Sequence, residues 1–243
     1  MNTLVDIILI VLIILGAIAG MRKGLIKSLV SFVGLIAIVV ISYTLRVPLS
    51  DFLIDKMPFL SFGGSLLGIT SINILIFNVI AFVVIFIVMY SILNIILNIT
   101  GFIDTILKFT VIWVIPSKIG GAILGFLEMW VYLFLVLFVL GQFSITANFI
   151  SDSKVSNMIL DKTPVVGNFL SGARNAAKEI YSGIEEFSKD ETKSSSDLNL
   201  FVLQTEINYG LITKEKANEL LETGKIGIDN IMIGHKGNLW SNI

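Results

Sequence analysis

Four long apolar stretches constrain this chain more than any other feature of its sequence. They cover residues 4–20, 25–45, 72–98 and 117–143. A helix rises about 1.5 Å per residue, so roughly 17 residues is the shortest helix that crosses the hydrocarbon of a bilayer. Lipid offers no hydrogen-bond partners, and a helix satisfies its own backbone. We therefore predict an all-α integral membrane protein with about four transmembrane helices.

The charged residues divide the chain into two regions. Residues 1–145 hold 7 Lys/Arg and 5 Asp/Glu, whereas residues 146–243 hold 10 and 13. Over the whole chain only 14% of residues are charged, against about a quarter in soluble domains. The sequence thus predicts a transmembrane helical domain over 1–145 and an extramembrane C-terminal helical region over 146–243.

The segments between the spans predict shorter helices at the membrane surface. Arg46 and Pro48 should end the second helix, because proline cannot donate the next helical hydrogen bond. Residues 52–57 are then expected to form a short interfacial helix. Residues 101–116 are apolar but interrupted, which favours an interfacial or re-entrant helix.

The polar tail contains three further helical patterns. Residues 164–189 predict an amphipathic helix, and 198–209 and 214–223 predict two short helices joined by a turn. Gly210 can take the left-handed conformation that ends one helix, and Thr213 can cap the next.

Basic residues beside short loops set the orientation of a membrane protein. Arg22, Lys23 and Lys27 lie between the first two spans, so this loop is expected in the cytoplasm and both termini outside. The rival interpretation of residues 4–20 is a cleaved signal peptide, suggested by Ala17-Ile18-Ala19. It lacks the positive N-terminal region that such peptides carry, so we favour a membrane helix.

Glycines recur at four-residue spacing in two of the predicted spans. Such spacing lets helix backbones approach closely in lipid, where small residues drive packing. We expect these glycines to pack the first span against the fourth, with self-association as the alternative. The residues are Gly16, Gly20, Gly24, Gly121 and Gly125.

A few polar residues fall within the apolar stretches. Glu128 lies near the expected middle of the bilayer, where a bare carboxylate is costly. It is expected either as a neutral acid bonded to an asparagine or as a proton- or ion-linked group. Asp6 is expected at the interface, reaching headgroups or capping its helix. A polar stripe on the third span favours interhelical hydrogen bonds over a pore lining: Asn73, Asn78, Ser91, Asn94 and Asn98.

Catalytic and cofactor patterns are missing from the sequence. It has no cysteine and one histidine, His235, and it lacks hydrolase, zinc-protease and phosphate-loop motifs. Without a basic run there is no footprint for nucleic acid. We expect no enzyme, no cofactor, no metal and no nucleic-acid partner.

Several short motifs resemble the colicin V production protein family. The likeness begins at Asp6-Ile7-Ile8 and continues through Gly20-Met21-Arg22-Lys23-Gly24, residues 117–125 and Ser153-Lys154-Val155-Ser156. The chain departs from the family pattern at Glu128 and Met129. The resemblance implies a four-span cytoplasmic-membrane protein linked to production of a secreted peptide toxin and to envelope integrity. It implies no catalytic or ligand residues.

Three hypotheses for the function follow. The first is a non-enzymatic protein that supports peptide-toxin (bacteriocin) export or envelope homeostasis, contacting an envelope or export partner through its tail. The second is an oligomeric channel or proton-linked transporter that uses Glu128. The third is a membrane anchor whose tail is an interaction module. Besides the lipid bilayer, a second copy of the chain is a candidate partner.

Overall fold

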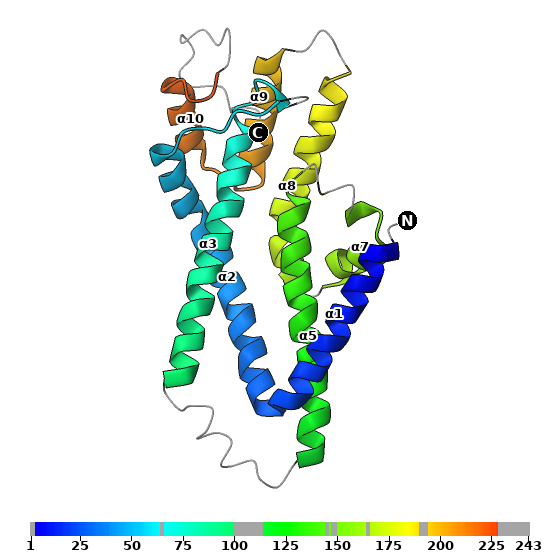
Figure 1. Cartoon of the computed structure of the whole chain (residues 1–243). Helices are drawn as coiled ribbons and strands as arrows, with labels where there is room; N and C mark the ends of the chain where they lie inside the picture. Colours follow the sequence, from blue (N-terminus) through cyan, green and yellow to red (C-terminus); the bar gives the residue numbers. More distant parts are fainter. Residues whose placement is uncertain are drawn as a thin grey trace.

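The computed structural model describes residues 3–63, 66–99, 114–143, 146, 150–163, 166–189 and 194–227, and in that part of the chain every regular element is a helix. Figure 1 shows long helices running up and down, with shorter ones gathered at the end opposite the α1–α2 turn. The predicted all-α membrane architecture is confirmed.

Among the residues just given, four helices are long and apolar enough to cross a membrane. They are α1 (Thr3–Lys23), α2 (Leu25–Lys56), α3 (Ile72–Ile99) and α5 (Val114–Gly141). Most of the predicted interfacial helix over 101–116 lies outside the described residues, and its last three residues form the start of α5. The four helices correspond in order to the four apolar stretches.

The predicted end of the second helix was wrong. α2 continues through Pro48 to Lys56, so residues 52–57 are not a separate interfacial helix. Proline inside a helix costs about 3 kcal/mol. Beyond it, however, Ser50 and Ile54 are completely buried, and burying an isoleucine contributes about 1.5–3 kcal/mol. Packing of this extension therefore offsets the proline.

The described part of the tail contains α7 (Lys154–Lys162), α8 (Val166–Phe187), α9 (Ser195–Asn208) and α10 (Lys214–Glu222). α7 was not predicted from the sequence. The expected turn before α10 is confirmed, because Gly210 has φ +65° and Thr213 caps α10 by accepting from the Lys216 amide. Pro164 lies outside the described residues.

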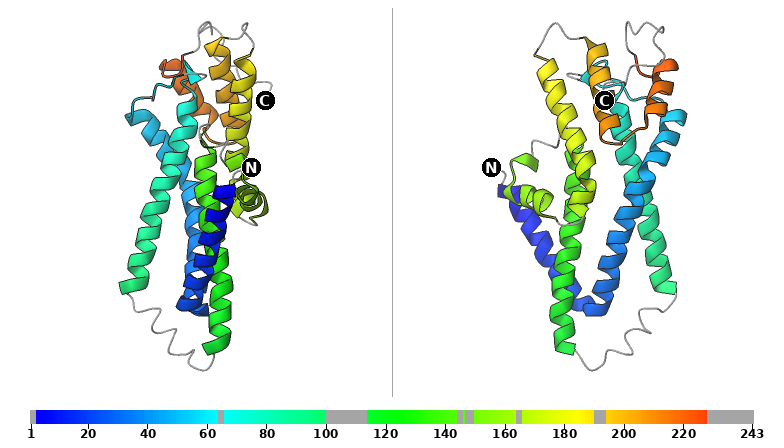
Figure 2. Two further views of the ribbon diagram at one scale, coloured as in Figure 1. Left: turned by 45° about the vertical axis from the view of Figure 1, so that its right-hand side comes forward. Right: turned by 180° about the vertical axis from the view of Figure 1, so that it is seen from behind.

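The tail helices share a core with the membrane helices. Leu35 of α2, Phe134 of α5 and Leu170 of α8 are almost fully buried in one cluster. A second cluster joins Ile54 and Phe77 to Leu203 of α9 and Leu220 of α10. Figure 2 shows α8, α9 and α10 against the upper parts of α2, α3 and α5 from both directions.

Burial changes along the length of α3. Its first turns are buried against α2 and α9, whereas Val84, Ile87 and Ile95 further on are exposed. Exposed aliphatic residues also cover α1. A water-soluble protein rarely exposes so much contiguous apolar surface, so the lower part of the bundle, from the α1–α2 turn upward, is the region that faces lipid.

Candidate functional site

The glycine faces of α1 and α5 lie directly against each other. A Cβ at Gly20 would lie 2.6 Å from the Gly125 Cα and closer still to the Gly121 carbonyl oxygen. A Cβ at Gly16 would meet Met129 and the Gly125 carbonyl. Only residues without a side chain allow this approach, so the two backbones are in contact along two helical turns.

The α1–α2 turn depends on Gly24 in another way. Gly24 has φ +79°, a conformation that side chains disfavour, and it lets the chain reverse with no intervening loop. Ser117 of α5 accepts a hydrogen bond from the Leu25 amide at 3.1 Å. The start of α5 is thereby fixed to this turn.

Glu128 lies where α1, α2 and α5 meet. Its carboxylate accepts a hydrogen bond from Ser31 of α2 at 2.7 Å and pairs with Lys23 of α1 at 3.4 Å. The Glu128 side chain is only 7% exposed, against 44% for Lys23. The expected asparagine is not among the contacts of Glu128 within the described side chains, and a lysine and a serine take its place.

A tyrosine pair continues this polar group toward α3. Tyr132 lies one turn beyond Glu128 on α5, and its buried hydroxyl lies beside both Glu128 and Tyr90. Its ring meets that of Tyr90 of α3 edge-on, with centroids 6.2 Å apart. The site thus draws side chains from all four long helices: Lys23, Ser31, Tyr90, Glu128 and Tyr132.

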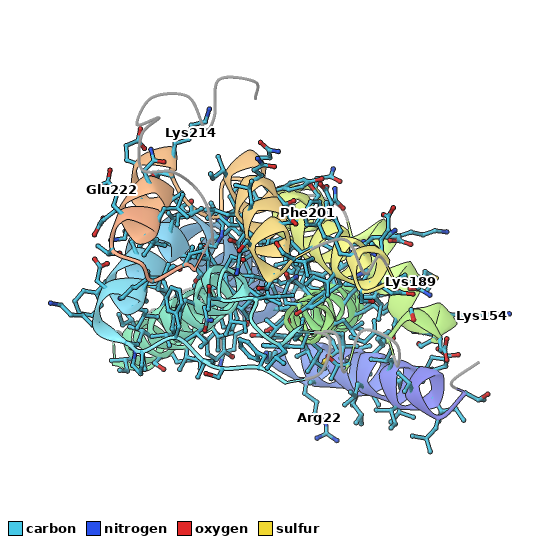
Figure 3. All side chains as sticks on the ribbon, turned by 90° about the horizontal axis from the view of Figure 1, so that it is seen from above. Arg22, Lys154, Lys189, Phe201, Lys214 and Glu222 are labelled. Atoms are coloured by element: carbon cyan, nitrogen blue, oxygen red, sulfur yellow. The ribbon has the colours of Figure 1, made fainter. Side chains whose placement is uncertain are left out.

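The other two basic residues of the first loop lie near Gly24. Arg22 is exposed and points away from the bundle in Figure 3, and Lys27 is half-buried at the start of α2. Of the three residues expected to set the orientation, Lys23 alone pairs with Glu128.

The polar stripe of α3 divides into two parts. Asn73 accepts from the Leu60 amide at 2.7 Å, and Asn78 donates to Ser50 of α2 and to the Leu211 carbonyl. Asn94 is exposed and donates to the Tyr90 carbonyl of its own helix. The Asn98 side chain lies outside the described residues. Among the described side chains of this stripe, the contacts with other segments therefore come from Asn73 and Asn78, in the first two turns of α3.

Asp6 contacts the tail. Its carboxylate accepts from the Ser153 hydroxyl at 2.5 Å and from the Val155 amide at 3.0 Å, at the start of α7. Ser153 also caps α7 by accepting from the Ser156 amide. Asp6 therefore ties α7 to the first turn of α1, a role different from the headgroup contact or self-capping that we expected.

Two buried polar residues that join the tail to α3 were not predicted from the sequence. Asn199 of α9 accepts from the amide and hydroxyl of Ser71, and Glu206 accepts from the Leu75 amide at 2.9 Å. The Leu75 amide lies in the first turn of α3. Both tail residues are separated from their partners by over a hundred positions, so no local signal identifies them.

Glu206 is completely buried, and its second carboxylate oxygen has no partner among the described residues. Desolvation raises the pKa of Glu206 well above its ordinary value, while the Leu75 amide acts weakly in the opposite direction. Burial therefore favours the neutral form of this acid over the carboxylate.

Clusters of three or more His, Cys, Asp or Glu that could hold a metal ion are not found among the described residues.

Comparison with known protein families gives a match over the part of the chain that carries the motifs of the first helix and of α5. The family described as colicin V production protein matches residues 5–164.

This chain belongs to the colicin V production protein family. The matched range includes all four long helices and α7, and with them the glycine contact and Glu128. An uncharacterized transmembrane protein, YshB, of Bacillus subtilis (strain 168) is 29% identical over 178 residues, which cover 69% of this chain and 95% of that protein. No solved structure matches. α8, α9 and α10 lie beyond the part that the family match covers.

Proposed function

We propose that this protein is a non-enzymatic scaffold of the bacterial cytoplasmic membrane, supporting peptide-toxin production or export or, more broadly, envelope homeostasis. The family membership supports this role. The observation that carries the scaffold is the shared core of membrane and tail helices, in which Glu206 and Asn199 of α9 bond to the start of α3. A partner bound to the tail is thereby held at a fixed position relative to the bilayer.

Deletion of the gene followed by complementation tests the role. Cells that lack the protein should secrete less of a co-expressed peptide toxin or tolerate envelope stress poorly, and the full chain should restore both. A complementing variant with Gly20→Ala, which disturbs the α1–α5 contact, should restore them incompletely. Unchanged secretion and unchanged stress tolerance in the deletion strain would contradict the proposal.

The orientation we propose places the α1–α2 turn in the cytoplasm and the tail outside. Arg22, Lys23 and Lys27 near that turn support it. Because the chain has no cysteine, a single Lys189→Cys variant should react with a membrane-impermeant maleimide in intact cells, since Lys189 is exposed. Lys118→Cys, at the opposite end, should react only after lysis. The reverse pattern would place the tail in the cytoplasm.

A second candidate function is an oligomeric channel or proton-linked transporter. The arrangement that favours it is Glu128 held between three helices, with the buried Tyr132 hydroxyl beside it. Reconstituted wild-type protein should then conduct protons or ions across liposomes, and Glu128→Gln should abolish the flux. Equal flux from the two proteins would remove this candidate.

The third candidate, an anchor that presents an independent tail module, predicts that isolated residues 197–232 associate in solution. In the full chain, however, the buried residues Leu203 and Leu220 of this segment pack against α2 and α3. We therefore favour the scaffold, in which the tail acts as part of the bundle.

A further inference from the structure

A cavity lies beside the end of the apolar stretch of α5. It has a volume of about 540 Å³, is open on one side, and is lined by the end of α5, by Ile150 and Ser151, by α7 and by α8. Figure 1 shows α7 and the lower half of α8 beside the upper part of α5. The cavity is therefore at the boundary between the lipid-facing part of the bundle and the polar helices.

One part of the cavity wall is apolar. Leu137 and Phe138 of α5 and Leu160 of α7 line it, and all three are buried in the core that α5 shares with the tail. Exposed Val136 and Leu140 of the same α5 turns face outward. A hydrocarbon chain that follows the surface of α5 would thus meet a continuous apolar wall.

Another part of the wall carries positive charge. Arg174 and Lys178 lie one turn apart on α8, and both line the cavity. Arg174 is paired with Asp161 at 2.9 Å, whereas Lys178 has no ion pair within the described part of the chain. Glu185, the acidic residue of the same lining, is paired with Lys189 at 2.9 Å. The unneutralised charge in the cavity is therefore positive.

A buried acceptor without a donor also lines the cavity. Gln142 is 2% exposed, and its side-chain oxygen has no hydrogen-bond partner among the described residues, although its amide nitrogen donates to the Phe138 carbonyl. An unmatched buried acceptor costs about 1–3 kcal/mol. A ligand with a hydroxyl or ammonium donor would remove that cost.

We infer that this cavity binds an anionic phospholipid with hydrogen-bond donors in its headgroup, of the phosphatidylglycerol type. Its phosphate lies against Arg174 and Lys178, a headgroup hydroxyl donates to Gln142, and its acyl chains follow Leu137 and Phe138. Arginine and lysine bind phosphate oxygens through charge-assisted hydrogen bonds. Lipid binding here is independent of the role proposed above.

Native mass spectrometry of the full-length protein in detergent tests the inference, with dioleoylphosphatidylglycerol as the probe and dioleoylphosphatidylcholine as the neutral comparison. The wild type should bind one phosphatidylglycerol about tenfold more tightly than phosphatidylcholine, since one charge-assisted hydrogen bond contributes about that factor. Arg174→Gln with Lys178→Gln should remove this preference. Inorganic phosphate should not displace the lipid.

The matched control removes two charges elsewhere. Lys154 and Lys214 are exposed residues outside the cavity lining (Figure 3), and changing both to Gln should leave phosphatidylglycerol binding unchanged. Asp161→Asn breaks the pair with Arg174 but should also retain binding, which separates loss of a ligand contact from loss of a salt bridge. Melting temperatures should show that all variants are folded.

Gln142→Leu tests the headgroup contact. It should weaken phosphatidylglycerol binding about three- to tenfold, the value of one hydrogen bond, and leave dioleoylphosphatidylmethanol, which has the same charge and no headgroup donor, unaffected. If the Lys154→Gln, Lys214→Gln control lost as much phosphatidylglycerol affinity as the Arg174→Gln, Lys178→Gln variant, the site would be overturned. Nonspecific charge attraction would then explain the binding. Equal affinity for phosphatidylcholine, or full displacement by inorganic phosphate, would overturn it as well.

Discussion

At Gly20 a single hydrogen atom on Cα sets the distance between two membrane helices. The surrounding atoms belong to the backbone of α5, at Gly121 and Gly125, and backbone cannot move aside as a flexible side chain can. Close approach of this kind is the main source of helix association in lipid, since the hydrophobic effect does not act between helices there. The α1–α5 contact should therefore be sensitive to one methyl group.

Replacing Gly20 with Ala should lower the free energy of unfolding by about 1–3 kcal/mol, the usual cost of overpacking. Alanine also favours the helix by about 1 kcal/mol, which reduces the loss without cancelling it. Thermal unfolding in detergent measures the difference. Gly141→Ala is the matched control, because a Cβ there meets nothing within 4 Å. A Gly20→Ala protein as stable as the control would contradict the close contact.

The pair between Glu128 and Lys23 should contribute modestly to stability. Lys23 is 44% exposed, so solvent weakens the attraction that a fully buried pair would have. A double-mutant cycle with Lys23→Met and Glu128→Gln should give a coupling of about 1 kcal/mol in the free energy of unfolding. Ser31→Ala in place of Lys23→Met provides a second cycle through the 2.7 Å hydrogen bond. Zero coupling in both cycles would exclude these contacts.

At the scale of elements, α7 depends on one serine. Ser153 caps the start of α7 and also donates to Asp6, so it both stabilises α7 and joins this helix to α1. Ser153→Ala should cost about 1–2 kcal/mol of unfolding free energy through loss of the cap and of a charge-assisted bond. Thr213→Ala removes a cap on α10 whose hydroxyl has no second partner among the described residues, and it should cost about 1 kcal/mol. Denaturant titration compares them, and a smaller effect at Ser153 would contradict its double role.

The contact between α9 and α3 should weaken as the pH rises. Burial raises the pKa of Glu206, so the folded state favours the neutral acid, whereas the unfolded chain loses the proton above the ordinary glutamate pKa of about 4.3. The folded state then binds more protons than the unfolded state, and stability falls with increasing pH from that value up to the raised pKa.

Glu206→Gln should remove this pH dependence, because an amide keeps an acceptor for the Leu75 amide and does not ionise. Unfolding free energies of the two proteins between pH 5 and 9 give the comparison. The free energy of unfolding of the wild type should fall relative to that of the variant as the pH rises, until the pH passes the raised pKa of Glu206. Parallel curves would mean that Glu206 is not buried as described.

The elements differ in how far the sequence determines them. The glycine spacing predicts the face that α1 offers to α5, and Thr213 predicts the start of α10, because both signals are local. The length of α2 was misjudged, since the burial of Ile54 by α9 and α10 outweighs Pro48 and is set by distant segments. The partners of Glu128 were missed for the same reason: Lys23 and Ser31 are close to it only in the folded chain.

At the scale of the whole molecule, membrane and polar helices form one body. α8 packs on α2 and α5, and α9 and α10 cover the extension of α2 and the start of α3. Figure 3 shows α10 at the edge of the molecule, with Lys214 and Glu222 pointing outward. The tail thus combines a buried face that holds it to the bundle with an exposed polar face that a partner can reach.

A zero-length carbodiimide cross-link in washed membranes tests this union most directly. Lys216 of α10 lies 2.5 Å from Asp55 of α2, so activated Asp55 should form an amide with Lys216 in full-length protein that stays in the membrane pellet. Mass spectrometry should detect the joined peptides, and Asp55→Asn should abolish them. The local pair Lys189–Glu185 serves as the positive control. Formation of the local link without the Asp55–Lys216 link, or protein found in the soluble fraction, would contradict a tail docked on a membrane bundle.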